Sequence, residues 1–367
     1  MRINYFVPRC TPENSHGRYV IELAKRMGAH HPVTIYSGAF WPPLRSVIQC
    51  RFLPVPNRPA VARLAALWVT SFVTARGCPG DIIHVQGADA PVANVVTAQC
   101  CTAVMRATKA RGSGLHRGMN FAIGAVGEKY CMSKSSTQRV IAVSNKVKEE
   151  IEREYGVDPE KVVVVPLGVD PEEFHPRQRA RWRATIRSRL ALGSDEFVVI
   201  FVGGDFRRKG LMELFAAASR LRSFRVLAVG VAPDPALKQL IQDHRLSKNV
   251  TFVNTTTEVA PLYAAADCFA LLTRYDTFSM STVEAMATGL PVIVSREAGV
   301  SEHLTNDADS IVLSDCLDVE ALVQQLQRLI GDPGLRVRLG ERARQTAEQF
   351  SWNRIAEQTL AVYRQVM

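Results

Sequence analysis

The stretch of sequence that decides the fold runs Cys268-Phe-Ala-Leu-Leu-Thr-Arg-Tyr-Asp276-Thr-Phe-Ser-Met-Ser-Thr-Val-Glu284-Ala-Met-Ala-Thr-Gly289-Leu-Pro-Val-Ile-Val294. The apolar residues 268–272 predict a buried parallel strand, and the polar residues 273–278 predict a turn. Residues 280–287 have a helical pattern, which Gly289-Leu290-Pro291 ends before a second apolar run. The stretch is therefore typical of a strand, a turn and a helix in an open α/β sheet.

Two acidic residues, Asp276 and Glu284, lie in the turn and early in the helix of this unit. Ligands of open α/β folds bind at the carboxyl ends of the strands, and the positive end of a helix favours an anion there. Carboxylates beside such an anion can accept hydrogen bonds from neutral hydroxyls. A phosphorylated sugar fits this description, and an ordinary unit with a solvated Asp and a capping Glu is the alternative.

Short apolar runs alternate with helical patterns along the whole chain. This alternation predicts parallel sheets in two doubly wound α/β domains. The Pro- and Gly-rich residues 166–176 separate the halves, and a long amphipathic pattern follows Ser351. The predicted strands are residues 3–7, 33–36, 82–85, 95–98, 140–142 and 162–165, and then 198–202, 225–229, 250–253, 268–272 and 291–294.

Length and composition narrow the class of protein. The chain has 367 residues, 47% of them apolar, which is enough for two cores of ordinary domain size. We find no apolar run of about 18 residues and no secretory signal, so we expect no membrane-spanning helix. The 8 cysteines form no Cys-x-x-Cys pair and have no regular spacing, which predicts a reduced cytoplasmic protein without a structural metal.

The charge is concentrated in the first half of the chain. Residues 1–145 contain 17 Lys and Arg against 5 Asp and Glu, whereas the remainder contains 28 against 30. This asymmetry indicates an anionic membrane surface, a phosphorylated glycan or a nucleic acid as partner, or simply a solvated basic face. Aromatic residues interleaved with the basic ones are too few for a nucleic-acid platform, so we expect no nucleic-acid partner.

A second motif, Phe201-Val-Gly203-Gly204-Asp-Phe-Arg207-Arg208-Lys209-Gly210, ends a predicted strand in glycines and then presents three cations. Glycines let the backbone approach a diphosphate, and Arg and Lys neutralise it. The chain has neither the loop of P-loop nucleotidases nor a G-x-G-x-x-G opening a helix, which disfavours nucleotidases and Rossmann oxidoreductases.

The segment from Asp276 to Val292 resembles the acid-x7-Glu motif of retaining GT-B glycosyltransferases of the large group 1 family, which includes lipopolysaccharide core glucosyltransferases. Residues 165–170 and 332–336 are also similar to landmarks of that family. The family usually has Glu at 276, Gly at 279 and His at 99, where this chain has Asp276, Ser279 and Gln99. Asp276 and Ser279 leave the donor sugar open, and Gln99 makes an inactive homologue a hypothesis to test.

The resemblance implies a domain order. Residues 1–170 would form an acceptor-binding Rossmann-like domain and residues 171–350 a nucleotide-sugar-binding one. Residues 351–367 would form a helix that returns to the N-terminal domain.

The resemblance also implies a site. Arg208 and Lys209, with Arg207 the weaker choice, would hold the leaving diphosphate without a metal, and Asp276 would orient the donor sugar. His16 and Gln99 would lie on the acceptor side, although His16 could equally be part of an ordinary surface loop. His84 is more often structural than catalytic. The remaining donor-binding residues would be Gly17, Gly203, Gly204, Val253, Asn254, Phe278, Ser279, Met280, Ser281 and Glu284.

The implied activity is retaining transfer of a hexose from a nucleotide-sugar, by default UDP-glucose, to a cell-envelope glycan or glycolipid, as in lipopolysaccharide or other polysaccharide biosynthesis. The nucleotide-sugar is a co-substrate, and no cofactor is implied. An inactive nucleotide-sugar-binding homologue, an epimerase and a phosphorylase are the alternatives.

A basic segment between Cys100 and Cys131 resembles the membrane-facing segment of lipopolysaccharide core enzymes. It is either a peripheral contact with an anionic membrane or a solvated pair of helices. Its basic and aromatic residues are Arg106, Lys109, Arg111, His116, Arg117, Phe121 and Lys129.

Overall fold

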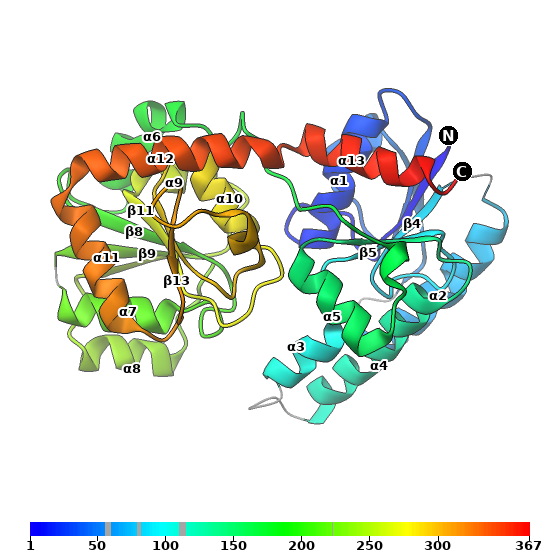
Figure 1. Ribbon diagram of the computed structural model, residues 1–367, viewed down its shortest axis with the longest axis horizontal. Coiled ribbons are helices and arrows are strands. Elements are labelled where there is room, and N and C mark those ends of the chain that lie inside the picture. Colours follow the sequence, from blue (N-terminus) through cyan, green and yellow to red (C-terminus); the bar gives the residue numbers. More distant parts are fainter. Residues whose placement is uncertain (56–59, 79–81, 110–114, 222) are drawn as a thin grey trace. The chain divides into compact units, whose positions relative to one another are not determined.

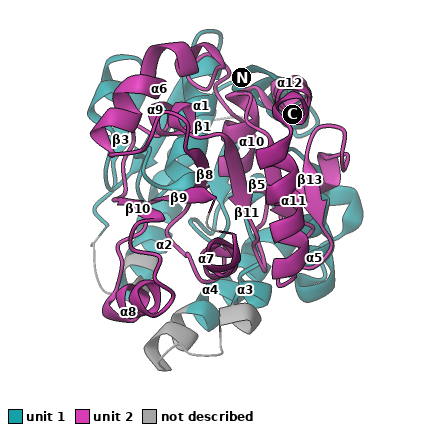
Figure 2. Cartoon of the chain, turned by 90° about the vertical axis from the view of Figure 1, so that its left-hand side faces the viewer, with its two compact units in different colours: residues 1–167, 352–367 teal, residues 168–351 magenta. Residues whose placement is uncertain are grey.

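The computed structural model describes residues 1–55, 60–78, 82–109, 115–221 and 223–367. The chain divides into two compact units (Figure 2). Unit 1 contains residues 1–167 together with 352–367, and unit 2 contains residues 168–351. Each unit is built around one parallel sheet with helices in the connections between strands (Figure 1).

Unit 1 has a seven-stranded sheet in the order β3-β2-β1-β4-β5-β6-β7. Its inner strands are buried on both faces, as expected for apolar runs covered by helices on both sides. The strand order reverses between β1 and β4, so the loops after these two strands lie at the switch point of this sheet. The strands are β1 (Ile3–Phe6), β2 (Val33–Ser37), β3 (Gln49–Phe52), β4 (Ile82–Gln86), β5 (Val95–Ala98), β6 (Arg139–Ala142) and β7 (Val162–Val164).

The helices of unit 1 begin at recognisable caps where the side chains are short and polar. The Asn14 side chain accepts a hydrogen bond from the Gly17 amide at the start of α1, and Ser144 caps α5 in the same way. The helices are α1 (Ser15–Met27), η1 (Pro42–Ser46), α2 (Ala60–Arg76), α3 (Thr102–Lys109), α4 (Leu115–Ser133), α5 (Asn145–Tyr155), η2 (Pro159–Lys161) and α13 (Trp352–Arg364).

A buried polar cluster fastens the C-terminal helix α13 to the sheet of unit 1. The Tyr363 hydroxyl lies 2.5 Å from Nδ1 of His84 and 2.9 Å from the Tyr5 hydroxyl. Nε2 of His84 lies 2.6 Å from the Thr97 hydroxyl, so both ring nitrogens have partners inside the core. Burial lowers the pKa of His84 to about 3, which keeps the imidazole neutral. His84 therefore stabilises the packing of α13, which also contacts α1.

Unit 2 has a six-stranded sheet in the order β10-β9-β8-β11-β12-β13. The order reverses between β8 and β11, which are paired in parallel from Cys268 and Val199 onward. The loops after β8 and β11 therefore leave the sheet side by side at its carboxyl edge. The strands are β8 (Phe197–Val202), β9 (Phe224–Val229), β10 (Val250–Val253), β11 (Cys268–Leu271), β12 (Val292–Ser295) and β13 (Ile311–Leu313).

The helices of unit 2 include α10, which is buried from Ser281 to Ala287. Small side chains such as Ala285 and Ala287 let this helix lie inside the unit with no solvent-facing side. The helices are α6 (Arg177–Arg189), α7 (Leu211–Arg220), α8 (Pro235–Asp243), α9 (Ala260–Ala265), α10 (Met280–Ala287), η3 (Gly299–His303), α11 (Val319–Gly331), α12 (Pro333–Ala347) and η4 (Glu348–Phe350).

Every strand that the sequence predicts is present, within one residue at each end, and the prediction of two doubly wound sheets is confirmed. The sequence missed the edge strands β3 and β13. β3 (Gln-Cys-Arg-Phe) is largely exposed and has no apolar run, whereas β13 (Ile-Val-Leu) is apolar but only three residues long, which is too short for the pattern to separate it from a loop. In the described part of the chain, no helix combines the length and the apolarity needed to cross a bilayer.

Candidate functional site

The loops that follow β8 and β11 are tied together at the switch point of unit 2. The amide of Arg274 donates to the carbonyl of Arg208 at 2.9 Å, and the Thr273 hydroxyl donates to the same carbonyl at 3.3 Å. In return, the Arg208 guanidinium donates to the carbonyl of Tyr275 and pairs through Nε with Asp205 at 2.9 Å. These contacts fix the two sequence motifs against each other.

Gly210 makes this close approach possible. Its φ of +84° lies in the left-handed region, and a Cβ at this position would overlap the carbonyl oxygen of Leu272. Gly203 has a related role, because a Cβ there would lie 2.6 Å from Cδ of Lys209. The two glycines thus leave space for the opposite loop and for the lysine stem.

Lys209 and Asp276 meet in the middle of the site. Nζ of Lys209 lies 3.3 Å from Oδ2 of Asp276, and both side chains are mostly buried. Burial by itself would raise the pKa of Asp276, but the positive charges of Lys209 and Arg208 outweigh it and lower that pKa. The carboxylate is therefore ionised at neutral pH, next to two cations.

The backbone of Asp276 is held by the loop after β12. Its amide donates to the carbonyl of Glu297 at 3.2 Å, and its carbonyl accepts from the Gly299 amide at 3.0 Å. A Cβ on Gly299 would overlap the carbonyl of Thr277, so this contact too requires glycine. Asp276 is consequently fixed on both sides of its Cα.

Phe278, Ser279, Met280 and Ser281 form the entry to α10. The Phe278 ring is buried against His303 and Phe350, so only its backbone can face a ligand. Ser279 is buried and adopts a φ of +82°, which is unusual for a residue with a Cβ. Its hydroxyl lies 2.7 Å from that of Thr282. The first amides of the helix have no intrahelical acceptor and point toward the carboxyl edge of the sheet.

Glu284 is buried one turn further along α10, 5% exposed, and is oriented by a residue that sequence reasoning missed. The Tyr263 hydroxyl, on α9, lies 3.0 Å from Oε2 of Glu284 and 3.0 Å from the carbonyl of Ser281. The Tyr263 ring packs on Phe174 and Phe269. A tyrosine inside the apolar pattern of α9 gave no sequence signal of this contact.

The other predicted donor residues of unit 2 follow neighbouring strands of the same edge. Gly204 follows β8. Val253 is the last residue of β10, two strands away, and Asn254 follows it. Strand spacing of about 4.8 Å places these two residues about 10 Å from the end of β8. The Val253 carbonyl accepts from the Gly230 amide at 2.9 Å, and Asn254 is exposed.

The remaining predicted residues, Gly17, His16 and Gln99, lie in unit 1. Nδ1 of His16 lies 3.8 Å from Oδ2 of Asp89, which brings together the start of α1 and the loop after β4 at that sheet's switch point. A Cβ on Gly17 would lie 2.7 Å from the carbonyl of Arg9, so glycine lets the first loop fold onto α1.

Gln99 follows β5 and is buried. Its Nε2 donates to Oε1 of Gln86 at 3.1 Å, and Gln86 is itself fully buried at the end of β4. Sequence reasoning did not identify Gln86 or Asp89 as companions of Gln99 and His16. Their position at the ends of neighbouring strands is the signal that could have found them.

Two further predictions concern metals and membranes. Among the described residues, no three His, Cys, Asp or Glu side chains are grouped so that they could hold a metal ion.

The basic segment between Cys100 and Cys131 falls on α3, α4 and the residues between them, and the side chains of residues 106–120 lie outside the described part. Of its predicted residues, Phe121 is half-buried and Lys129 is exposed.

Two family models match the chain, and between them they cover most of both units. Residues 16–173 match Glycosyltransferase Family 4, and residues 183–346 match Glycosyl transferases group 1.

Curated relatives match over about 60% of the chain. One is the MMP alpha-(1->4)-mannosyltransferase of Mycolicibacterium hassiacum, 32% identical over 61% of this chain and 53% of that protein. Another is the D-inositol 3-phosphate glycosyltransferase of Streptomyces bingchenggensis, 32% identical over 63% of this chain and 54% of that protein. The match thus spans about half the length of these relatives.

Solved structures resemble the chain over its whole length. WaaG, a glycosyltransferase involved in lipopolysaccharide biosynthesis, has a TM-score of 0.83 at 20% identity, with 98% of this chain and 99% of that chain covered. Sucrose-phosphate synthase from Thermosynechococcus elongatus has a TM-score of 0.80 at 21% identity, with 100% and 99% covered. The Anabaena HepE protein in complex with UDP and glucose has a TM-score of 0.77 at 18% identity, with 98% of each chain covered. These likenesses confirm the predicted GT-B fold.

Proposed function

Because the chain belongs to the group 1 glycosyltransferases of the GT-B fold, we propose that it transfers a hexose, with retention, from a nucleotide-sugar to a glycan or glycolipid of the cell envelope. UDP-glucose is the first donor to test. The observation that carries the proposal is the contact of Lys209 with Asp276, beside Arg208, at the switch point of unit 2. It places two cations and one ionised carboxylate where open α/β sheets bind ligands.

In this proposal, Lys209 and Arg208 hold the donor diphosphate and stabilise it as it leaves, in place of a metal ion. Lys209 would lie beside a phosphate bound by the amides of Ser279, Met280 and Ser281 at the start of α10, and its contact with Asp276 supports this. Gly203 and Gly204 allow the backbone after β8 to approach the phosphates. Charge-assisted contacts of this kind strengthen as charge develops on the departing oxygen.

Asp276 would accept hydrogen bonds from hydroxyls of the donor sugar. Its lowered pKa supports this role, since an ionised carboxylate accepts through both oxygens. On donor binding, Lys209 would lie between this carboxylate and the diphosphate and contact both.

Glu284 would accept hydrogen bonds from the ribose, with Tyr263 fixing its orientation. Val253 and Asn254 would lie beside the base. Their position two strands from β8 supports this, because a nucleoside extends about that far from its phosphates.

The acceptor would bind to unit 1 near His16, Gly17 and Gln99. Transfer with retention would take place on one face of the donor sugar. The bond from the anomeric carbon to the phosphate oxygen breaks, and a bond from that carbon to the acceptor oxygen forms on the same side. The acceptor's proton passes to the departing phosphate. Gln99 can donate to or accept from a hydroxyl but is no general base, and this scheme asks for none there.

A peripheral contact of unit 1 with an anionic membrane is the second part of the proposal. Val69, Phe72 and Val73 on α2 and Val126 and Tyr130 on α4 are exposed apolar residues. The two helices are neighbours, with the Trp68 and Tyr130 rings 5.7 Å apart. Exposed apolar groups next to a basic segment are typical of interfacial binding.

Liposome flotation tests the membrane contact. Val73→Asp should reduce the fraction of protein that floats with anionic vesicles. Val47→Asp, at a similarly exposed valine outside α2 and α4, should not. Equal recovery of the two variants contradicts the contact.

A panel of UDP-, GDP- and ADP-sugars in a thermal-shift assay tests the function. The true donor should raise the melting temperature by mass action, and product analysis with that donor should show transfer. Lys209→Ala should abolish the transfer, whereas Lys248→Ala, at an exposed lysine just before β10 and hence at the opposite edge of the sheet, should not.

A binding protein without activity is the competing candidate, favoured by Asp276, Ser279 and Gln99. A donor that shifts the melting temperature but gives no product with any acceptor would support it.

A further inference from the structure

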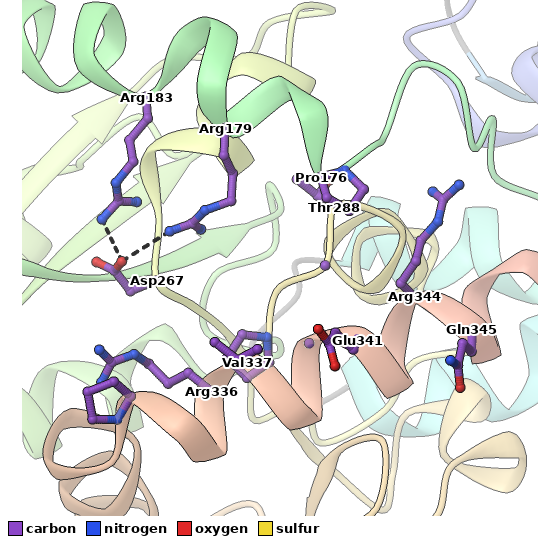
Figure 3. Close-up of a pocket in the computed structure, with 14 residues that line it drawn as sticks. Pro176, Arg179, Arg183, Asp267, Thr288, Arg336, Val337, Glu341, Arg344 and Gln345 are labelled. Carbon is purple, nitrogen blue, oxygen red and sulfur yellow. Dashed lines mark hydrogen bonds and ion pairs between the residues drawn. The ribbon is translucent and has the colours of Figure 1, made fainter.

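Unit 2 has a pocket of about 700 Å³ at the amino-terminal edge of its sheet, opposite the proposed donor site (Figure 3). Asp267 and Pro291 line it, and they come immediately before β11 and β12. Helices α6 and α12 form its walls, and Thr288 and Gly289, at the end of α10, also line it. None of the proposed donor-binding residues lines this pocket.

The pocket is lined by more cations than anions. Arg179 and Arg183 extend from α6 toward Asp267, and Arg336 and Arg344 come from α12 (Figure 3). Glu341 is the other acidic residue in the lining.

Three guanidinium groups share the single carboxylate of Asp267. Arg183 lies 2.6 Å from its Oδ1 and Arg187 lies 2.7 Å from its Oδ2, while Arg179 lies 3.5 Å from Oδ1. Burial, and after it repulsion from Arg183, lowers the pKa of Arg179, and the same two causes lower the pKa of Arg187. The cluster therefore has positive charge that Asp267 does not neutralise.

Backbone carbonyls satisfy most of the remaining guanidinium donors. Arg183 donates to the carbonyls of Ala265 and Ala266, and Arg344 donates to that of Ala287 at 2.8 Å. Carbonyls supply hydrogen bonds but no net charge. Together with Arg187 and Glu348, which form ion pairs with Asp267 and Arg344, the charged lining residues make five guanidinium groups and three carboxylates in the part of the chain that the structure describes, a surplus of two positive charges.

We propose that this pocket binds a small phosphate monoester, at a site separate from the donor site. Two surplus charges match a phosphate dianion, and the guanidinium of Arg336, which among the described residues donates to backbone carbonyls only through Nη1, has donors left that suit phosphate oxygens. Pro176, Pro291, Pro333 and Val337 give the pocket an apolar part that can hold the organic group of the ester. Its volume lies in the range of small-molecule sites.

Charge changes that spare the structural arginines provide the test. Val337 is 58% exposed and lines the pocket, so Val337→Glu adds a negative charge to the lining, and Val337→Gln, which loses the same apolar side chain, is its uncharged match. Glu341 is exposed, and Glu341→Gln removes a negative charge from the lining.

Glycerol 3-phosphate and inorganic phosphate serve as probes, with glycerol as the uncharged control. Binding is measured by calorimetry in the Lys209→Ala background, which weakens phosphate contacts at the donor site. A unit charge about 8 Å from a dianion in water changes affinity on the order of threefold or more. We expect Val337→Glu to weaken binding by that factor relative to Val337→Gln, and Glu341→Gln to strengthen it.

Three results overturn the proposal. They are no saturable binding of either phosphate probe, equal affinities for Val337→Glu and Val337→Gln, or binding of glycerol as strong as that of glycerol 3-phosphate. Circular dichroism of each variant verifies that the fold is intact. The proposal does not depend on glycosyl transfer, so its failure leaves the proposed function untouched.

Discussion

Replacing Lys209 by Gln removes the central charge of the proposed donor site and leaves a side chain of similar length. An ammonium about 3 Å from a phosphate oxygen interacts by about 5 kcal/mol at an effective dielectric constant of about 20. Part of this is offset by lost hydration, and removal of single charge-stabilising donors in other enzymes costs about 2.7–4 kcal/mol. We therefore expect kcat/KM to fall about a hundred- to a thousandfold.

The same substitution has a second consequence, at Asp276. With Lys209 gone, only the Arg208 charge and the hydrogen bond from the Phe278 amide still oppose the effect of burial, so the pKa of Asp276 rises. An Asp276 carboxyl must be ionised to act as proposed. In the wild-type protein its lowered pKa confines the loss of activity to acidic solution. In Lys209→Gln the acid limb of the kcat/KM profile should therefore begin at a higher pH.

The assay is product formation from the donor that the thermal-shift panel identifies, measured for wild type, Lys209→Gln and Lys248→Gln across the acid range. Lys248→Gln changes the same net charge at the opposite edge of the sheet, and it should keep wild-type rates. A loss below tenfold for Lys209→Gln, or an unshifted acid limb, refutes the assignment of Lys209 and Asp276 to one charged centre.

Three further predictions concern stability. Burial lowers the pKa of His84 to about 3, whereas the ordinary value of 6.5 applies in the unfolded chain. Between these two pH values only the unfolded chain binds a proton at His84, so the folded state loses stability as the pH falls below 6.5. Urea denaturation at pH 7 and pH 5 should show a loss about 2 kcal/mol larger for wild type than for His84→Phe, and equal losses contradict the buried neutral imidazole. Gly210→Ala should cost about 2 kcal/mol or more, because its Cβ overlaps a carbonyl at positive φ, whereas Gly331→Ala, with open space around it, should change stability by less than about 1 kcal/mol. Ser279→Gly should be more stable than Ser279→Ala by about 1 kcal/mol in the same assay, since both lose the bond to Thr282 and only glycine relieves the positive φ; the reverse order contradicts the backbone strain.

The sequence predicted the fold well where apolar runs are continuous. Strands such as β8 and β11 are buried on both faces and leave an unbroken apolar signal, whereas β3 pairs only with β2 and exposes Phe52. An edge strand as polar as β3 leaves no apolar signal, and one as short as β13 leaves too brief a signal, so both are defined by pairing with a neighbouring strand. Pattern reasoning along one segment has no access to that neighbour.

The site was predictable to the extent that it follows from strand ends. Lys209 and Asp276 follow β8 and β11, which the order of connections makes adjacent, so their contact is a consequence of topology. Arg207 and Arg208 could not be separated by sequence, because they are consecutive cations. In the structure Arg208 bonds into the β11 loop, while the Arg207 guanidinium lies over the ring of Phe206, which favours Arg208 in the proposal.

The residues that follow α10, from Thr288 to Pro291, hold this helix against α12. Gly289 has a φ of +76°, and a Cβ on Gly340 of α12 would overlap the carbonyl of Gly289. The end of α10 is thus held against α12 by two glycines, while Pro291 leads directly into β12. Because α10 is a rigid, buried helix of eight residues, fixing its end also fixes the height of Glu284 and of the first-turn amides above the sheet. Helix α10 must reach from the carboxyl edge of the sheet to α12. Its length therefore sets the spacing in the sequence between Asp276 and Glu284 and the residues Gly289-Leu290-Pro291. A substitution at Gly340 should accordingly disturb the proposed donor site through α10, although it touches none of that site's residues.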